Sequence, residues 1–212
     1  MDNSDALLLK ITDDIKRQYG CHTVILYGSR ARGDVTDTSD YDIIAIRENG
    51  EFQRDCKLIN GFYLDAFIYS EESIKQIDDS LIRIKDGKVI CQKDSIGDLL
   101  LKTINDRFIQ GAPKTPDWEK NEISVWARKM LNRAKKDDIE GSFRRHWLLH
   151  DLLECYFKMR DIWFLGSKES FDWLKNNDAA TYFAFKVALK FNSNNSEIEE
   201  LIERVTDLKI IC

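Results

Sequence analysis

A glycine–serine turn followed by closely spaced aspartates constrains the fold of this chain more than any other feature. The turn, Gly28-Ser29, follows the short apolar run Thr23–Tyr27, whose β-branched and aromatic residues predict a buried strand. Gly28 permits a sharp turn where a side chain would obstruct a close ligand. Ser29 is expected to open a short helix, whose free N–H groups suit a phosphate.

Carboxylates follow this turn at a spacing that suits metal binding. Tyr41–Arg47 predicts a second strand, and Asp40 and Asp42 lie two residues apart, so on a strand their side chains share one face. Asp65 lies in the strand-like run Phe62–Tyr69, where an unpaired charge is unfavourable unless it binds something. If the two strands are neighbours, three carboxylates converge, and repulsion raises the pKa of at least one. Oxygen ligands of this kind predict a site for two Mg²⁺ ions.

Together these segments resemble the signature of the DNA polymerase β-like nucleotidyltransferase superfamily, and they are most similar to minimal and antibiotic nucleotidyltransferases of bacteria. The resemblance covers roughly residues 1–112 and is carried by Tyr27-Gly28-Ser29, Asp40-Tyr41-Asp42-Ile43 and Leu64-Asp65-Ala66. It implies that Gly28 and Ser29 bind the triphosphate of an NTP. It implies further that Asp40 and Asp42 hold both metals, with Asp65 completing the catalytic metal site. The family transfers a nucleoside monophosphate to a hydroxyl and releases pyrophosphate.

Two arginines follow the turn. Arg30 is a candidate phosphate ligand, because a guanidinium donates charge-assisted hydrogen bonds. The alternative role for Arg30 and Arg32 is an ion pair with a nearby acid such as Asp34 or Asp37. Either motif alone, the Gly-Ser turn or the Asp-x-Asp pair, also occurs by chance in an acidic protein. Their agreement in order and spacing with the third acidic strand favours an enzyme.

Composition narrows the classes of partner. The 212 residues are 43% hydrophobic and 33% charged, as in ordinary globular proteins, and the formal net charge of −5 disfavours a broadly basic nucleic-acid-binding surface without excluding a local one. No apolar run approaches a membrane span, and the first residues are acidic and unlike a signal peptide. The five cysteines are scattered without metal-ligand spacing, which predicts reduced thiols in a cytoplasmic protein.

Prolines mark the expected domain boundary. Pro113 and Pro116 interrupt the helical pattern, so we predict an α/β (α+β) domain with a small mixed sheet over residues 1–112 and an all-α domain over residues 113–212. The helices expected from periodicity and capping residues lie at 4–19, 70–82, 95–109, 118–136, 142–164, 168–176, 178–191 and 195–208.

The helical half offers further candidates. Arg145 and His150 have a spacing similar to the Arg-x4-His motif of HEPN-domain ribonucleases, although a core helix with histidine at its edge accounts for the same pattern. Glu154 and Asp151 are candidate general bases for an acceptor hydroxyl, and Asp65 is an equal candidate.

These patterns predict a Mg²⁺-dependent nucleotidyltransferase that moves NMP, with AMP from ATP preferred, onto a small antibiotic-like molecule or onto a macromolecule such as tRNA or a toxin protein. The acidic balance favours a cationic small acceptor. The rival interpretation is an antitoxin-like or regulatory module that acts on a protein or tRNA partner. Acceptor identity, base preference and oligomeric state, a homodimer included, are left open.

Overall fold

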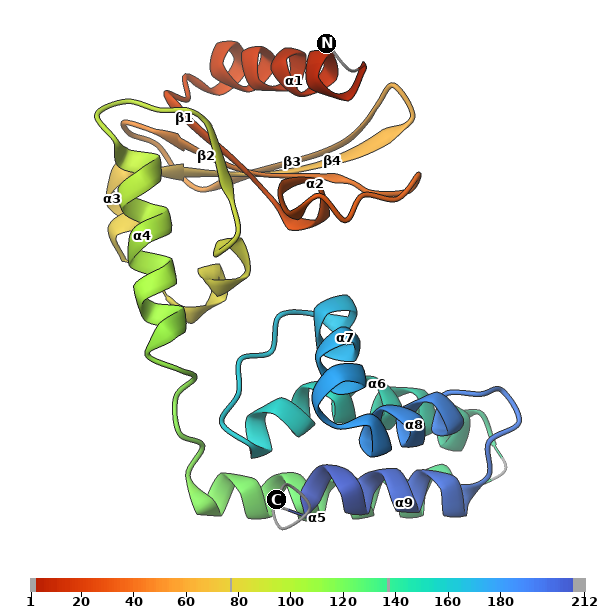
Figure 1. The fold of residues 1–212 in the computed structure, drawn as a ribbon. Coiled ribbons are helices and arrows are strands. Elements are labelled where there is room, and N and C mark those ends of the chain that lie inside the picture. Colours follow the sequence, from red (N-terminus) through yellow and green to blue (C-terminus); the bar gives the residue numbers. More distant parts are fainter. Residues whose placement is uncertain (1–2, 77, 137, 208–212) are drawn as a thin grey trace. The chain divides into compact units, whose positions relative to one another are not determined.

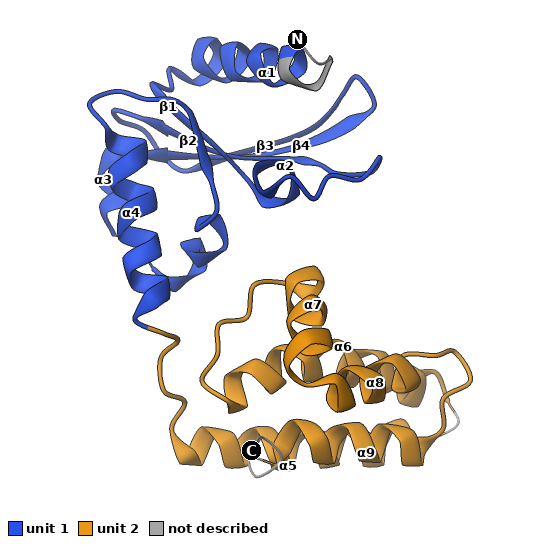
Figure 2. Ribbon diagram, in the orientation of Figure 1, with its two compact units in different colours: residues 1–110 blue, residues 111–212 orange. Residues whose placement is uncertain are grey.

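The computed structural model describes residues 3–76, 78–136 and 138–207, and its chain forms two compact units, residues 1–110 and 111–212 (Figure 2). The predicted domain boundary after residue 112 stays a prediction, because compactness alone does not establish independent folding. Cys212, one of the cysteines predicted to be reduced, lies outside the described residues. The other cysteines, Cys21, Cys56, Cys91 and Cys155, are free thiols.

The first unit is an α/β arrangement built on one sheet. Its elements are α1 (Asn3–Tyr19), β1 (Thr23–Tyr27), α2 (Gly28–Arg32), β2 (Tyr41–Arg47), β3 (Gln53–Ile59), β4 (Phe62–Ser70), α3 (Glu71–Lys75), the 3-10 helix η1 (Asp79–Ile84), β5 (Lys88–Cys91) and α4 (Ile96–Ile109).

The sheet has the strand order β3-β4-β2-β1-β5 and is mixed, as predicted. Strands β2 and β4 run parallel, whereas the other neighbours are antiparallel. The β3–β4 hairpin turns at Asn60 and Gly61, which both have positive φ, the conformation that an Asn-Gly hairpin turn requires. The hairpin places β3 beside β4, and β4 in turn lies beside β2.

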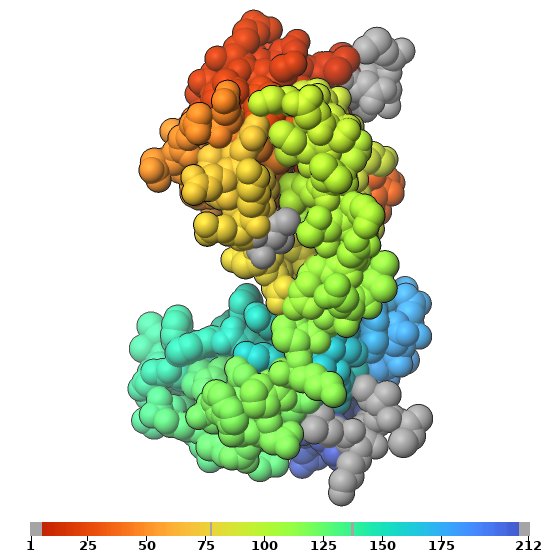
Figure 3. All heavy atoms as spheres, turned by 90° about the vertical axis from the view of Figure 1, so that its left-hand side faces the viewer, coloured from red at the N-terminus to blue at the C-terminus, as the bar shows by residue number. Residues whose placement is uncertain are grey.

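Helices cover both faces of the sheet. Helix α1 lies across one face (Figure 1), because Leu7, Ile11 and Ile15 form an apolar stripe that is buried against the strands. The opposite face carries Ile25 and Ile44, which are both fully buried. On that side of the unit the atoms of α4 lie beside those of the segment containing η1 (Figure 3).

One predicted helix of the first unit is wrong. Residues 70–82 were expected to form a single helix, but the structure has the short helix α3 followed by η1. Ser70 caps α3 as expected, and Asp78 then accepts a hydrogen bond from the backbone N–H of Ser80 and begins η1. A second capping residue inside the predicted helix therefore starts a new element there.

The second unit is helical, as predicted. Its elements are α5 (Asp117–Ala134), α6 (Ile139–Met159), α7 (Ser167–Asn177), α8 (Ala179–Ala188) and α9 (Asn195–Thr206). Leu148, Leu152, Tyr156 and Phe185 are among the fully buried side chains of its core. Within the described part of the chain, none of the helices is long and apolar enough to cross a membrane.

Helix α6 begins earlier and ends earlier than the predicted helix over 142–164. Asp138, rather than Ser142, is the N-cap, and its side chain accepts a hydrogen bond from the N–H of Gly141. A Cβ atom at Gly141 would overlap the carbonyl oxygen of Lys136, so glycine permits this tight first turn. Both Asp and Ser are good N-caps, so residue type alone does not choose between the two positions.

Candidate active site

The turn after β1 lies against the first acid-bearing strand. Gly28 has a φ of 71° and leads from β1 into α2, and Tyr27 pairs with Asp42 across the β1–β2 ladder. A Cβ atom at Gly28 would overlap the Asp42 carboxylate, so a larger residue does not fit without displacing that acid. The motif residues Gly28 and Asp42, which are well separated in sequence, are therefore in direct contact.

Two of the three predicted acids face each other across neighbouring strands. Asp42 on β2 is directly opposite Asp65 on β4 in the parallel ladder, and both side chains lie on the face opposite α1. Asp40 was expected on the strand of Asp42, but β2 begins at Tyr41, so Asp40 lies in the loop just before the strand and is exposed.

The acids affect one another electrostatically. Burial, followed by the charges of Asp40 and Asp65, raises the pKa of Asp42 above that of an ordinary aspartate. Asp42 is thus the acid whose pKa rises, but burial and not the predicted repulsion is the larger cause. The pKa of Asp65 is instead lowered, chiefly because Arg54 hydrogen-bonds to its carboxylate. The pKa of Asp42 is therefore above the usual value for an aspartate, whereas the pKa of Asp65 is below it.

A neighbouring strand holds Asp65 in place. Arg54 on β3 donates from Nε to Oδ1 of Asp65 at 2.7 Å and from Nη2 to Oδ2 at 2.8 Å. The thiol of Cys56, which is paired with Asp65 across the β3–β4 ladder, donates to Oδ1 at 3.0 Å. The Asp65 side chain is 25% exposed and thus stays open to solvent beside this ion pair. Sequence analysis identified neither Arg54 nor Cys56. The signal for them was that alternate side chains of β3 share one face, next to the strand that carries Asp65.

A third residue outside the motifs also lies at this face. The guanidinium of Arg83, on η1, lies 4.8 Å from the ring centroid of Phe67 and 5.8 Å from that of Tyr27. Its charge lowers the pKa of both Asp42 and Asp65, although neither effect is the largest on either acid. Among the described residues Arg83 forms no ion pair with a carboxylate, so its charge is available at the acidic face.

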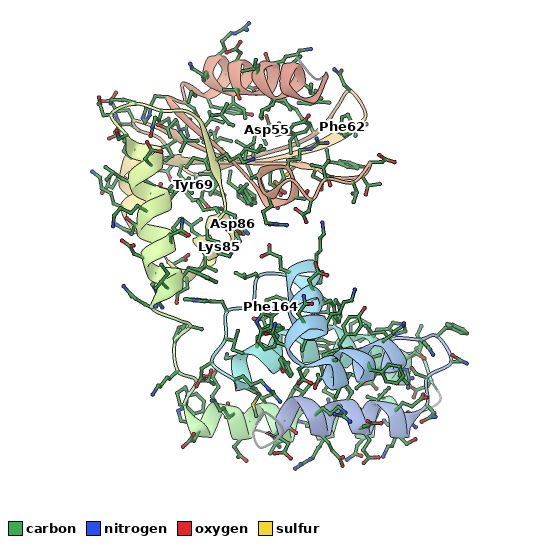
Figure 4. All side chains as sticks on the ribbon, in the orientation of Figure 1. Asp55, Phe62, Tyr69, Lys85, Asp86 and Phe164 are labelled. Carbon is green, nitrogen blue, oxygen red and sulfur yellow. The ribbon has the colours of Figure 1, made fainter. Side chains whose placement is uncertain are left out.

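The predicted phosphate ligands have mixed surroundings. Ser29 is half-buried at the start of α2, next to Gly28. Arg30 donates to the backbone carbonyls of Ser39 and Asp40 and lies over the rings of Tyr41 and Phe62, the latter labelled in Figure 4.

These contacts hold the loop before β2 in place, so the observed contacts of Arg30 are structural. Its role in phosphate binding stays a prediction. Arg32 pairs with Asp34 at 3.3 Å, as its alternative interpretation expected.

The candidates of the second unit lie on α6. Arg145 donates to the carbonyl and hydroxyl oxygens of Ser193, and Nδ1 of His150 lies 2.8 Å from Oδ1 of Asp151. Arg145, His150 and Glu154 line the same cavity. These contacts neither assign nor remove a catalytic role, so the candidate roles of Asp151 and Glu154 as general base stay predictions.

The acidic face presents hard carboxylate oxygens, the ligands that divalent cations prefer. Burial is the main cause of the raised pKa of Asp42, and the charges of Asp40 and Asp65 add to it. Among the described residues, no three His, Cys, Asp or Glu side chains are grouped so that they could hold a metal ion, so the predicted convergence of three carboxylates is not observed. Because Arg54 occupies both oxygens of Asp65, a cation at Asp65 has to share or displace that guanidinium.

The chain is similar to one protein family and to solved structures. Residues 8–109 match the family model of the nucleotidyltransferase domain. The crystal structure of a nucleotidyltransferase-like protein from Exiguobacterium sibiricum is similar with a TM-score of 0.41 and 14% identity, covering 94% of this chain and 72% of that chain. No curated protein matches the chain. The family match spans nearly the whole of the first unit and places a nucleotidyltransferase domain there, as the sequence resemblance implied.

Proposed function

We propose that this chain is a metal-dependent nucleotidyltransferase that transfers NMP from an NTP to a hydroxyl acceptor and releases pyrophosphate. The observation that carries the proposal is the line of contacts from Gly28 to Asp42 and from Asp42 to Asp65 across three adjacent strands. This line brings two carboxylates to one face of the sheet, together with a glycine turn that suits a phosphate. We propose ATP as the NTP, which follows the resemblance in sequence.

Different side chains of the proposed site bind the triphosphate and the metal. Gly28 and Ser29 bind the triphosphate, because the turn leaves room for it and the first N–H groups of α2 are free to donate. Asp40, Asp42 and Asp65 hold the divalent metal, with two Mg²⁺ ions proposed. When bound, these ions neutralise charge on the phosphates and on the attacking and leaving oxygens.

Arg83 supplies a further positive charge at this face. Its position over Phe67 fixes the guanidinium without a carboxylate partner among the described residues. A preorganised cation of this kind stabilises negative charge that develops during transfer. We therefore propose that Arg83 contacts the phosphates as pyrophosphate departs.

The proton of the acceptor hydroxyl requires a base. While Arg54 holds Asp65, the lowered pKa makes Asp65 a weak base, which supports metal binding over proton transfer as its role. Glu154 and Asp151 remain the candidates on the second unit. A pH–rate profile of variants at these acids distinguishes them, because loss of the base alters the acid limb of the profile.

The acceptor is proposed from charge alone. A net charge of −5 favours a cationic small molecule of the antibiotic type over a nucleic acid, with a macromolecular acceptor as the alternative. The proposal of a cytoplasmic, bacterial setting rests on the sequence resemblance.

The experiment that tests the function is incubation with each of the four NTPs labelled at the α-phosphate, with magnesium and a panel of amino-sugar, tRNA and protein acceptors. Transfer of label to an acceptor, abolished by a chelator, is the expected result. The second candidate, a regulatory module without turnover, is favoured by the ion pair that engages both oxygens of Asp65. It predicts NTP-dependent stabilisation with neither label transfer nor pyrophosphate release.

A further inference from the structure

The second unit contains a cavity of its own. Its volume is about 720 Å³, within the range of small-molecule sites. Helix α6 forms one wall, α7 and the segment before it form another, and the residues after α8 complete it. The apolar lining comes from Leu149, Leu153, Phe164 and Phe171, and Phe164 is labelled in Figure 4. A space of this size lined by aliphatic and aromatic groups suits the ring system of a small molecule.

The charges around this cavity are mainly positive. Arg145 and Lys190 line it, together with two histidines, whereas Glu154 is the acid among the lining residues. Arg145 is held by its hydrogen bonds to Ser193, which place its charge at the wall without movement of the side chain. Lys190 is exposed and has no ion-pair partner among the described residues. The mainly positive charge of the cavity lining contrasts with the net charge of −5 for the whole chain.

An aromatic side chain stands at the edge of the same cavity. Phe191 follows Lys190 and is fully exposed to solvent. A phenylalanine in this position adds little to folding, because none of its surface is removed from water. A ligand that enters the cavity beside it would give this ring an apolar contact. The exposed ring and the free ammonium are thus neighbours in sequence at one wall of one apolar space.

We propose that this cavity binds a small organic anion, namely an apolar ring system that carries a carboxylate, sulfonate or phosphate group. The rings pack on Leu149, Leu153 and Phe171, Phe191 covers them, and Lys190 pairs with the anionic group while the fixed charge of Arg145 adds to the attraction. The site lies within the second unit and does not depend on nucleotidyl transfer by the first.

The test uses two fluorescent probes on the full chain. Anilinonaphthalene sulfonate is an aromatic anion, and phenylnaphthylamine has the same ring system without the charge. We expect saturable binding of the sulfonate, with the Kd raised about fivefold or more by Lys190→Glu, since a direct pair becomes a repulsion. The neutral probe should bind more weakly to the wild type and should bind Lys190→Glu and wild type alike.

Matched variants locate the binding. Lys186→Glu reverses another exposed lysine, on α8, that does not line the cavity, and Phe183→Ser removes an exposed ring there. Sulfonate binding should be unchanged in both, whereas Phe191→Ser should weaken binding of both probes. Since Lys190 and Phe191 are exposed, retained neutral-probe binding and thermal melting confirm that Lys190→Glu is folded.

The proposal would be overturned by the absence of saturable sulfonate binding, by equal losses in Lys186→Glu and Lys190→Glu, or by tighter binding of the neutral probe than of the anion. Displacement of the sulfonate by a single-stranded oligoribonucleotide, lost in Lys190→Glu but unaffected by Phe191→Ser, would instead identify the cavity wall as a nucleic-acid surface and would equally overturn it.

Discussion

The Cα atom of Gly28 faces the carboxylate of Asp42 so closely that a Cβ atom would overlap the Asp42 oxygen. Gly28 belongs to the turn after β1 and Asp42 to β2, so the contact joins the predicted phosphate-binding turn to the predicted metal ligand. Any side chain at Gly28 has to displace Asp42 or move the turn.

Gly28→Ala should abolish most activity, with a loss of about a hundredfold or more, because the new methyl group displaces Asp42. Gly33→Ala is the matched control, since Gly33 also has positive φ but no atom lies within 4 Å of its Cβ position. Both variants should lose about 1 kcal/mol of stability from backbone strain. Steady-state kinetics and urea unfolding compare them, and equal activities would contradict the account.

Asp42→Asn should stabilise the protein at neutral pH when a chelator removes divalent ions. The pKa of Asp42 is raised in the folded state, so folding favours its protonated form. The associated stability is present below the pKa of an unfolded aspartate and is lost as pH rises through the raised value. The gain from Asn should therefore vanish in acid. Urea denaturation across this pH range tests the sign, and a variant less stable than wild type at neutral pH would refute it.

Arg54→Met should lower the magnesium concentration that gives half-maximal activity, by about threefold, because the guanidinium competes with the cation for Asp65. Lys57→Met is a control on the same strand, where Lys57 pairs with Asp55 instead. Magnesium titration of the initial rate measures both. A higher magnesium requirement in Arg54→Met would show that the arginine assists metal binding.

Arg83→Met should reduce kcat by about a hundredfold with little change in unfolding, since the arginine acts on developing phosphate charge. Its cation–π contact contributes only about 0.5–1 kcal/mol at an exposed position. Arg107→Met tests whether a loss of kcat arises from a disturbed η1, because Arg107 forms an ion pair with Asp79 in that element. A similar kcat loss in both variants would assign Arg83 a structural role.

Sequence alone located the strands that carry the site. β1, β2 and β4 are apolar runs bounded by turn residues, and Asp42 and Asp65 are exceptions to that apolar pattern, which is why they could be identified. Arg54 and Arg83 could not be identified in this way. Arg54 reaches Asp65 only through the antiparallel register of β3 and β4, and Arg83 reaches the same face through η1.

Helix ends were predicted least well, for a related reason. Asp78 and Asp138 each start an element that the sequence pattern assigned differently. Several capping residues occur close together in both segments, and tertiary packing selects among them. In the second unit, the start of α6 depends on the space that Gly141 leaves for Lys136.

The most direct test of the central claim is pyrophosphate release from the accepted NTP by Asp42→Asn and Asp65→Asn, measured beside Asp37→Asn. Asp37 is an exposed aspartate in the loop before β2 and serves as the matched control. We expect losses of about a hundredfold or more in the two site variants, unchanged release in the control, and intact thermal unfolding in all three. Release near the wild-type rate from either Asp42→Asn or Asp65→Asn would contradict the proposed metal-dependent site.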